Sequence, residues 1–154
     1  RLGSGSTPPI ARPGLGLLLL ALLAGCQVGG TEGDGDDTSD NTTPVYRNVS
    51  AAEADQLIAD HADDTGFVIL DVRTAAAFAA GHLAGAVNLD YYADDFRDRL
   101  DRLDKAKTYL VYCASGGRSG STMTIMEELG FQTVYNLTGG LSAWTAAGYP
   151  TTTD

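Results

Sequence analysis

The feature that most constrains the fold of this chain is the regular order of short apolar runs and helical patterns after Val45. Four of the runs have the length and the apolar or β-branched content of buried strands, and they cover residues 67–70, 86–89, 108–112 and 133–136. A helical pattern follows each run. Strands that alternate with helices are joined by crossover connections, which produce parallel pairs. We therefore expect an α/β domain with a mainly parallel sheet.

The helical patterns are defined by capping residues and by apolar spacing. Ser50 and Glu53 form a capping box that predicts a helix running towards His61. Thr74 is placed to cap a short alanine-rich helix that continues through Phe78. Further helices are expected over residues 94–103, around Met123, Met126 and Leu129, and over residues 141–147. The apolar residues at helical spacing are expected to face the core.

The clearest strand, residues 108–112, leads directly into Cys113. In open parallel sheets, ligands bind beyond the carboxyl ends of the strands. Cys113 is therefore predicted to lie at the edge of the sheet where a binding site forms. The residues that follow it are mostly small, and they are Ala114, Ser115, Gly116, Gly117, Arg118 and Ser119.

This segment has the composition of a loop that stabilises a thiolate. Small residues allow the backbone to curl so that successive N–H groups point at one centre, and the following helix adds free N–H groups and the positive end of its dipole. We therefore expect the pKa of Cys113 to lie below the ~8.5 of a free thiol. A thiolate is a nucleophile without a general-base histidine. Arg118 offers paired donors to an arriving oxyanion.

The alternative for Cys113 is a small structural cysteine beside a glycine turn. The glycines, Arg118 and the strand–loop–helix context together favour the reactive interpretation. The two cysteines, Cys26 and Cys113, and the two histidines, His61 and His82, are too scattered in the sequence to suggest a metal site. We expect neither a metal nor an organic cofactor.

Three segments resemble the motifs of rhodanese domains, and together they span roughly Tyr46 to Pro150. The segments are residues 68–73 with 81–88 for the first family signature, 111–119 for the active-site loop, and 137–140, 144 and 148–150 for the closing segment. The resemblance implies a central, mainly parallel five-stranded sheet with helices on both faces. It also implies an enzyme of the thiosulfate sulfurtransferase type, which moves a sulfane sulfur through a persulfide on Cys113 to a thiol or cyanide acceptor.

The resemblance assigns roles to other residues as well. The loop from Cys113 to Arg118 corresponds to the active-site cradle. Asp71 and Arg73 correspond to a buried polar pair that braces the loop region, a structural role in keeping with the rule that buried ions occur paired. His82 matches the motif histidine of the family, which we interpret as a structural hydrogen-bonding residue.

Two other functions are considered on the same fold. Cysteine-dependent phosphatases and arsenate reductases use a similar Cys–Arg loop, but their spacing would require arginine at position 119, where this chain has Ser119. The shorter loop from Cys113 to Arg118 favours a single transferred sulfur over a tetrahedral phosphate. The second alternative is a non-catalytic persulfide carrier, a redox sensor or an interaction module.

The charge of the chain narrows the choice of partners. Twenty acidic residues against ten basic ones give a net charge of −10. Such a surface repels nucleic acids, so we exclude a nucleic-acid-binding function. The expected partners are a small-molecule sulfur donor and a thiol acceptor.

Residues 1–26 have the pattern of a bacterial lipoprotein signal peptide. Arg1 and Arg12 precede an apolar run over residues 15–23, which is too short to span a membrane. Ala24-Gly25-Cys26 then resembles a lipobox, so Cys26 is expected to carry a lipid that anchors the protein on the extracytoplasmic side of a bacterial membrane. A plain secretory signal is the alternative. The expected organisation continues with a disordered acidic linker over residues 27–44, the folded domain over residues 45–150 and a tail over residues 151–154.

Overall fold

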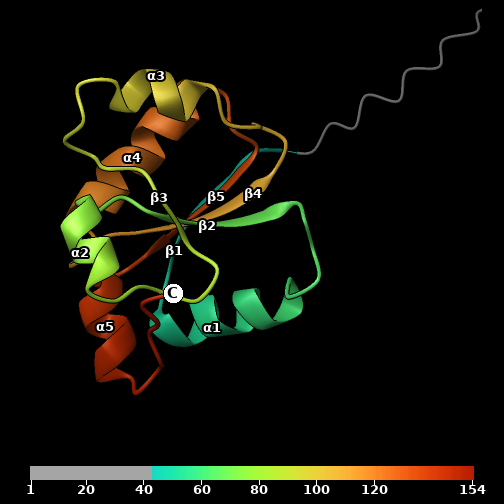
Figure 1. The fold of residues 1–154 in the computed structure, drawn as a ribbon. Helices are drawn as coiled ribbons and strands as arrows, with labels where there is room; N and C mark the ends of the chain where they lie inside the picture. Colours follow the sequence, from blue (N-terminus) through green and yellow to red (C-terminus); the bar gives the residue numbers. More distant parts are fainter. Residues whose placement is uncertain (1–42) are drawn as a thin grey trace, which may run out of the picture. The chain divides into compact units, whose positions relative to one another are not determined.

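The computed structural model describes residues 43–154, and these form five strands and five helices in strict alternation (Figure 1). The strands are β1 (Val45–Val49), β2 (Phe67–Asp71), β3 (Val87–Asn88), β4 (Thr108–Tyr112) and β5 (Thr133–Leu137). The helices are α1 (Ala51–Asp60), α2 (Ala75–Ala79), α3 (Phe96–Asp101), α4 (Gly117–Glu128) and α5 (Gly140–Ala146). This alternation confirms the predicted α/β fold.

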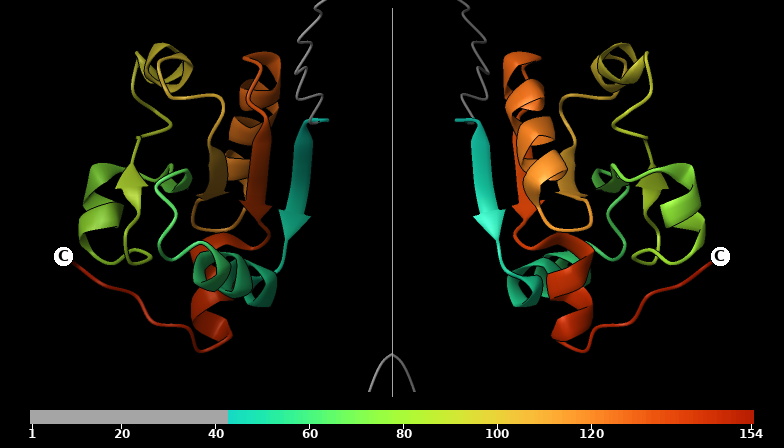
Figure 2. Two further views of the ribbon diagram at one scale, coloured as in Figure 1. Left: turned by 90° about the vertical axis from the view of Figure 1, so that its right-hand side faces the viewer. Right: turned by 90° about the vertical axis from the view of Figure 1, so that its left-hand side faces the viewer.

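The five strands form one sheet in the order β1-β5-β4-β2-β3, and every strand pair is parallel. Figure 2 shows β1 and β3 at opposite edges of the sheet. β4 is the central strand, where Val111 lies between Leu70 of β2 and Asn136 of β5. Because β4 is central, Cys113 follows it at the middle of the carboxyl edge of the sheet.

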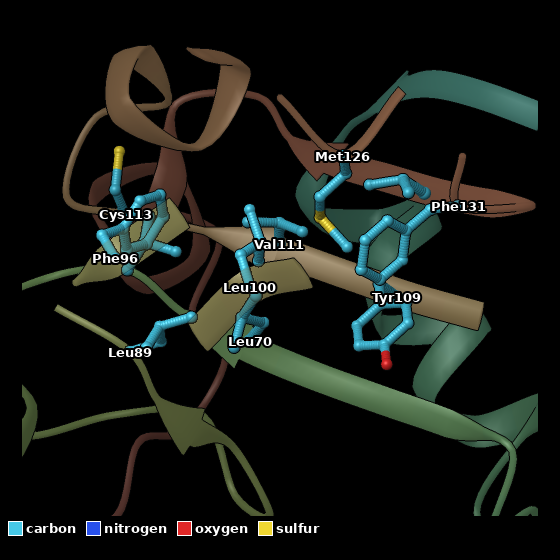
Figure 3. Close-up of a cluster of buried hydrophobic side chains, with 11 residues drawn as sticks. Leu70, Leu89, Phe96, Leu100, Tyr109, Val111, Cys113, Met126 and Phe131 are labelled. Carbon is cyan, nitrogen blue, oxygen red and sulfur yellow. The ribbon is translucent and has the colours of Figure 1, made fainter. Parts of the chain in front are cut away.

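The side chains of β4 point alternately into two hydrophobic cores, as the two-residue period of a strand requires. Tyr109 and Val111 belong to the first core, which is covered by α3 and α4 (Figure 3). Leu110 and Tyr112 belong to the second core, which is covered by α1 and α5 and includes Trp144. Helices therefore cover both faces, and β4 is buried from Tyr109 to Tyr112 because neither of its faces meets water there.

The predicted capping residues are present. The Ser50 hydroxyl accepts from the backbone N–H of Glu53 (3.3 Å), and the Glu53 carboxylate accepts from the backbone N–H of Ser50 (2.8 Å), which completes the capping box of α1. The Thr74 hydroxyl accepts from the N–H of Ala77 (3.3 Å) at the start of α2. Each bond supplies a partner to a group that a helix end leaves unpaired.

The four predicted strands are confirmed to within one residue at each end, but the apolar runs missed one strand and one helix prediction needs correction. β1 was not among the apolar runs, and only the family resemblance implied a fifth strand. The helix predicted over residues 94–103 is α3, which is shorter at both ends. Tight turns replace its ends, since the N–H of Phe96 donates to Ala93 (3.0 Å) and the N–H of Leu103 to Leu100 (3.1 Å).

The predicted signal peptide, the lipidation of Cys26 and nearly all of the predicted linker lie outside the described residues. Residues 151–154, expected as a tail, contact the domain: Thr152 forms an antiparallel bridge with His82, with N–H to O distances of 2.8 Å in both directions. No helix in residues 43–154 is both long enough and apolar enough to cross a bilayer.

Candidate active site

Cys113 begins the short connection between β4 and α4, and its side chain is 1% exposed. Ser115 on this connection and Gly117 at the start of α4 are exposed, so the outer side of the loop meets solvent. The loop thus places a buried sulfur directly beneath an accessible surface.

The first carbonyl groups of the loop are held by the start of α5. The N–H of Leu141 donates to the oxygen of Cys113 (2.8 Å), and the N–H of Ser142 donates to the oxygen of Ala114 (3.0 Å). Gly140 permits this approach, because a Cβ at that position would lie 2.3 Å from the Cys113 oxygen. In a planar trans peptide the N–H points opposite to the carbonyl. Fixing the Ala114 oxygen on α5 therefore directs the N–H of Ser115 to the other side, where it helps to lower the pKa of the Cys113 thiol.

A glycine turn brings a further N–H to the sulfur. Gly116 has a φ of +95°, and a Cβ at that position would lie 2.9 Å from the backbone nitrogen of Gly139. A side chain is therefore excluded at Gly116 both by its left-handed backbone and by its neighbour. In this conformation the N–H of Gly116 donates to Cys113 Sγ over 3.1 Å.

Ser119 completes the surroundings of the sulfur. Its hydroxyl is fully buried and lies 3.5 Å from Cys113 Sγ and 3.2 Å from the carbonyl oxygen of Gly116. The hydroxyl carries a single proton, so it donates to one of the two acceptors at a time. The sequence placed Ser119 in the loop but gave no reason to aim its side chain at the thiol.

These contacts oppose the effect of burial on the thiol. Burial by itself raises the pKa of Cys113, but hydrogen bonds from the Ser119 hydroxyl and from the backbone N–H groups of Ser119, Ser115 and Gly116 outweigh it, and the pKa is lowered. The direction agrees with the expectation from the sequence. The hydrogen bonds that lower the pKa thus come from the backbone and from one hydroxyl.

Arg118 lies in the first turn of α4 and is half-buried. Its guanidinium carbon lies 5.5 Å from the centre of the Tyr92 ring. Among the ion pairs found within residues 43–154, none includes Arg118. Within these residues, the guanidinium of Arg118 thus lies next to an aromatic ring and forms no ion pair.

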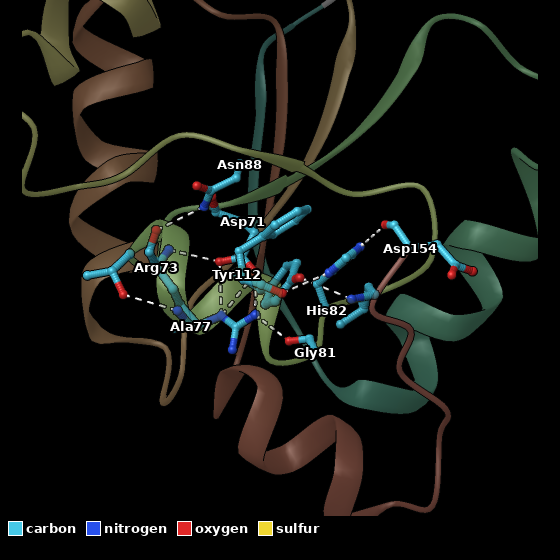
Figure 4. A network of polar contacts seen from close by, with 11 residues as sticks. Asp71, Arg73, Ala77, Gly81, His82, Asn88, Tyr112 and Asp154 are labelled. Carbon is cyan, nitrogen blue, oxygen red and sulfur yellow. Dashed lines mark hydrogen bonds and ion pairs between the residues drawn. The ribbon is translucent and has the colours of Figure 1, made fainter.

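The predicted pair of Asp71 and Arg73 forms at the end of β2 (Figure 4). Arg73 Nε lies 3.0 and 2.9 Å from the two carboxylate oxygens of Asp71, and its Nη2 lies 2.6 Å from Oδ2. Nη2 also donates to the carbonyl oxygen of Gly81 (2.7 Å). The two residues are 0% and 5% exposed, so each charge is neutralised away from water.

Two residues that sequence reasoning missed extend this pair. The Asn88 amide donates to the carbonyl oxygens of Asp71 (3.1 Å) and Arg73 (2.9 Å). The Tyr112 hydroxyl accepts from the N–H of Leu83 (3.1 Å). Burial, and next a hydrogen bond to Asp71, raise the pKa of Tyr112. Because Tyr112 immediately precedes Cys113, the network is connected to the base of the loop. In the sequence, the only indication of these two residues was a polar group at the end of a strand.

His82 lies apart from the thiol, next to the C-terminal residues. Its ring stacks on Phe78 at a centroid distance of 3.7 Å, and its nitrogens lie 2.9 Å from the carbonyl oxygens of Phe78 and Asp154. In the described part of the chain, no hydrogen bond joins His82, Asp71 or Arg73 to Cys113. Residues 43–154 also contain no cluster of three or more potential metal ligands.

Comparison with known proteins identifies the family. A family model described as "Rhodanese-like domain" matches residues 50–147. The chain belongs to the rhodanese-like family. The match includes the Cys113 loop and the Asp71–Arg73 pair, and it places both inside one family domain.

Two relatives of this rhodanese-like chain are named as thiosulfate sulfurtransferases. "Thiosulfate sulfurtransferase 16, chloroplastic" of Arabidopsis thaliana is 36% identical over 122 residues, which cover 73% of this chain and 96% of the relative. "Thiosulfate sulfurtransferase GlpE" of Coxiella burnetii is 33% identical over 102 residues, or 66% of this chain and 90% of the relative. The rhodanese-like domain thus accounts for nearly the whole length of both.

Solved structures agree with the fold. A rhodanese-related protein from Thermoplasma volcanium matches with a TM-score of 0.59 at 28% identity, covering 71% of this chain and all of that one. The rhodanese-like domain of an Anabaena protein matches with a TM-score of 0.58 at 30% identity, covering 68% and 77% of the two chains. The five-stranded parallel sheet is therefore the rhodanese-like fold.

Proposed function

We propose that this protein is a sulfurtransferase that moves a sulfane sulfur from a thiosulfate-type donor through a persulfide on Cys113 to a thiol or cyanide acceptor. The observation that carries the proposal is the set of donors around Cys113 Sγ, which combines the N–H of Gly116 at 3.1 Å with the hydroxyl of Ser119 at 3.5 Å. These donors favour a thiolate and then the terminal sulfur anion of a persulfide. The two thiosulfate sulfurtransferases among the relatives support the same chemistry.

The reaction needs no group beyond these residues and the two substrates. The Cys113 thiolate attacks the outer sulfur of thiosulfate, a new S–S bond forms, and the S–S bond of thiosulfate breaks as sulfite leaves with the electron pair. An acceptor thiolate or cyanide then attacks the terminal sulfur, and Cys113 leaves as the thiolate. Each step exchanges one bond to sulfur for another, so no external oxidant is required. A nucleophile that is already ionised also requires no general base.

The loop geometry argues against phosphate ester hydrolysis. Position 119, where the phosphatase spacing requires arginine, carries a buried serine that lies against Sγ. Arg118 instead lies over Tyr92. A phosphoryl group needs donors for three equatorial oxygens as charge develops on them. In the short loop of this chain, the N–H of Gly116 and the hydroxyl of Ser119 are instead directed at the sulfur.

The test is the intact mass of a Cys26→Ser variant, in which Cys113 is the single cysteine, before and after incubation with thiosulfate. We expect one added sulfur, its removal by cyanide and the release of thiocyanate. Replacement of Cys113 by Ser in the same background is the matched control and should abolish all three. Absence of the added sulfur, or phosphatase activity without thiocyanate, would overturn the proposal. A complete but slowly discharged persulfide would instead assign the protein to sulfur carriage.

We also propose that the protein is anchored to a bacterial membrane by a lipid on Cys26, on the basis of the apolar run and the lipobox-like residues that precede it. The full chain expressed in a bacterium should partition into membranes. The Cys26→Ser variant should be released or remain unprocessed. Soluble wild-type protein cleaved at another site would contradict this localisation.

A further inference from the structure

Arg118 differs from most other described arginines because its charge lies against an aromatic ring and not against a carboxylate. Of the six arginines in residues 43–154, four lie within 4.0 Å of an acidic side chain, namely Arg47, Arg73, Arg97 and Arg99, whereas Arg102 and Arg118 do not. In a chain with a net charge of −10, such pairing is the common outcome for an arginine. A carboxylate beside Arg118 would cancel much of the positive potential that an anionic donor needs. An aromatic ring holds the cation through its electron-rich face and brings no compensating charge.

Tyr92 is fixed in position even though its side chain is 67% exposed. Its ring meets the Tyr91 ring edge-on at 5.6 Å, and Tyr91 in turn lies 5.1 Å from the ring of Phe96, which is buried in the first core. Asp90 Oδ1 accepts from the N–H of Tyr92 (2.9 Å) and fixes the turn. A continuous row of three aromatic rings therefore runs from the core to the guanidinium of Arg118.

We infer that Tyr92 is a positioning residue that holds the guanidinium of Arg118, in the first turn after the Cys113 loop, and thereby favours small anionic sulfur donors. Tyr92 acts through Arg118 and not on the sulfur. The contact uses the charge of the guanidinium, so the N–H groups stay available for the oxygen atoms of the donor. The inference deepens the proposed sulfurtransferase reaction and rests on it for the identity of the natural donor.

This arrangement explains why a bulky aromatic side chain is left in water beside the loop. Two-thirds of the Tyr92 surface is exposed, so the ring contributes little to the core. An arginine side chain has several rotatable bonds and loses entropy when a substrate immobilises it. A ring that holds the guanidinium in advance reduces this loss for every donor that binds through Arg118.

The inference can be tested without any sulfur transfer, by comparing two reagents that alkylate the same thiolate. Iodoacetate and iodoacetamide share a leaving group and differ in charge, so the ratio of their rates reports the positive potential at the loop and cancels the fraction of thiolate. We expect this ratio to fall in Arg118→Ala. It should fall about two- to fivefold in Tyr92→Leu, the size of an exposed cation–aromatic contact, and stay near the wild-type value in Tyr92→Phe.

The controls separate this effect from others. All proteins carry Cys26→Ser. The control variant is Val87→Ala, which alters an exposed apolar residue on the edge strand β3. We expect this substitution to leave the ratio unchanged. Tyr92→Leu does not change net charge, so a lower ratio must come through Arg118. An unchanged ratio in Tyr92→Leu, or an equal fall in Tyr92→Phe, would overturn the inference. Because persulfide formation is measured separately by mass, failure of this test is distinguishable from failure of the proposed function.

Discussion

Arg73 and Arg118 both follow interior strands at the carboxyl edge of the sheet, Arg73 after β2 and Arg118 after β4, but their side chains have opposite surroundings. Arg73 is 5% exposed and bonds to both oxygens of Asp71 and to the carbonyl of Gly81. Arg118 is half-buried and lies over the Tyr92 ring. The N–H groups of Arg73 are largely committed within the protein, whereas those of Arg118 remain available to a ligand. The same residue type thus stabilises the fold at one position and is suited to capture a donor at the other.

The largest effect is expected on stability, when the buried Asp71–Arg73 pair is broken. Asp71→Ala removes the buried carboxylate and leaves the Arg73 charge without its partner, which should lower the free energy of unfolding by about 3–5 kcal/mol. Urea denaturation measures this loss. Asp101→Ala, which breaks a surface ion pair with Lys105, is the control and should cost far less. Equal losses in the two variants would show that the buried pair is not a structural element.

The next effect concerns donor capture by Arg118. Arg118→Ala should reduce kcat/KM for thiosulfate by roughly ten- to a hundredfold or more, because a charge-assisted hydrogen bond contributes about 1.5–3 kcal/mol. Thiocyanate release under steady-state conditions measures the change. The unfolding free energy should stay close to that of the wild type. A large loss of stability with an unchanged kcat/KM would reverse the roles assigned to the two arginines.

A smaller effect is expected at Ser119, whose hydroxyl supports the thiolate but not the fold as a whole. Ser119→Ala should reduce the fraction of Cys113 thiolate at neutral pH by roughly two- to tenfold, the range for one hydrogen bond of about 0.5–1.5 kcal/mol. The rate of alkylation by iodoacetamide reports that fraction. Ser115→Ala is the matched control, because Ser115 acts through its backbone N–H, which alanine retains. Equal rates for Ser119→Ala and the wild type would show that the hydroxyl does not stabilise the thiolate.

Local sequence signals predicted the surroundings of Arg73 well. Asp71 and Arg73 are two residues apart at the end of a strand, so their pairing needs no distant contact. The Ser50–Glu53 capping box and the course of β4 into Cys113 are local in the same sense. The loop composition likewise predicted donors around the thiol. These features follow from backbone geometry within a few residues.

The surroundings of Arg118, by contrast, depend on contacts between distant segments. Tyr92 and Arg118 are 26 positions apart in the sequence and meet only after β4 and α4 are in place. The amides of α5 that hold the Cys113 and Ala114 carbonyls come from a still later segment. β1 became a strand by pairing with β5, the last strand in the sequence, and its own residues gave a weak signal. Composition and spacing carry no information about such contacts.

The most direct test of this account is the pH dependence of Cys113 alkylation by iodoacetamide in the Cys26→Ser and Cys26→Ser/Arg118→Ala proteins. Only the thiolate reacts, so the rate falls as the pH drops through the pKa of Cys113. Hydrogen bonds from the Ser119 hydroxyl and from backbone N–H groups lower that pKa against the effect of burial, and we assign Arg118 to donor capture instead. Both profiles should therefore share one midpoint, below the ~8.5 of a free thiol. A midpoint that returns to the free-thiol value in the Arg118→Ala protein would show that the guanidinium, and not the loop, stabilises the thiolate.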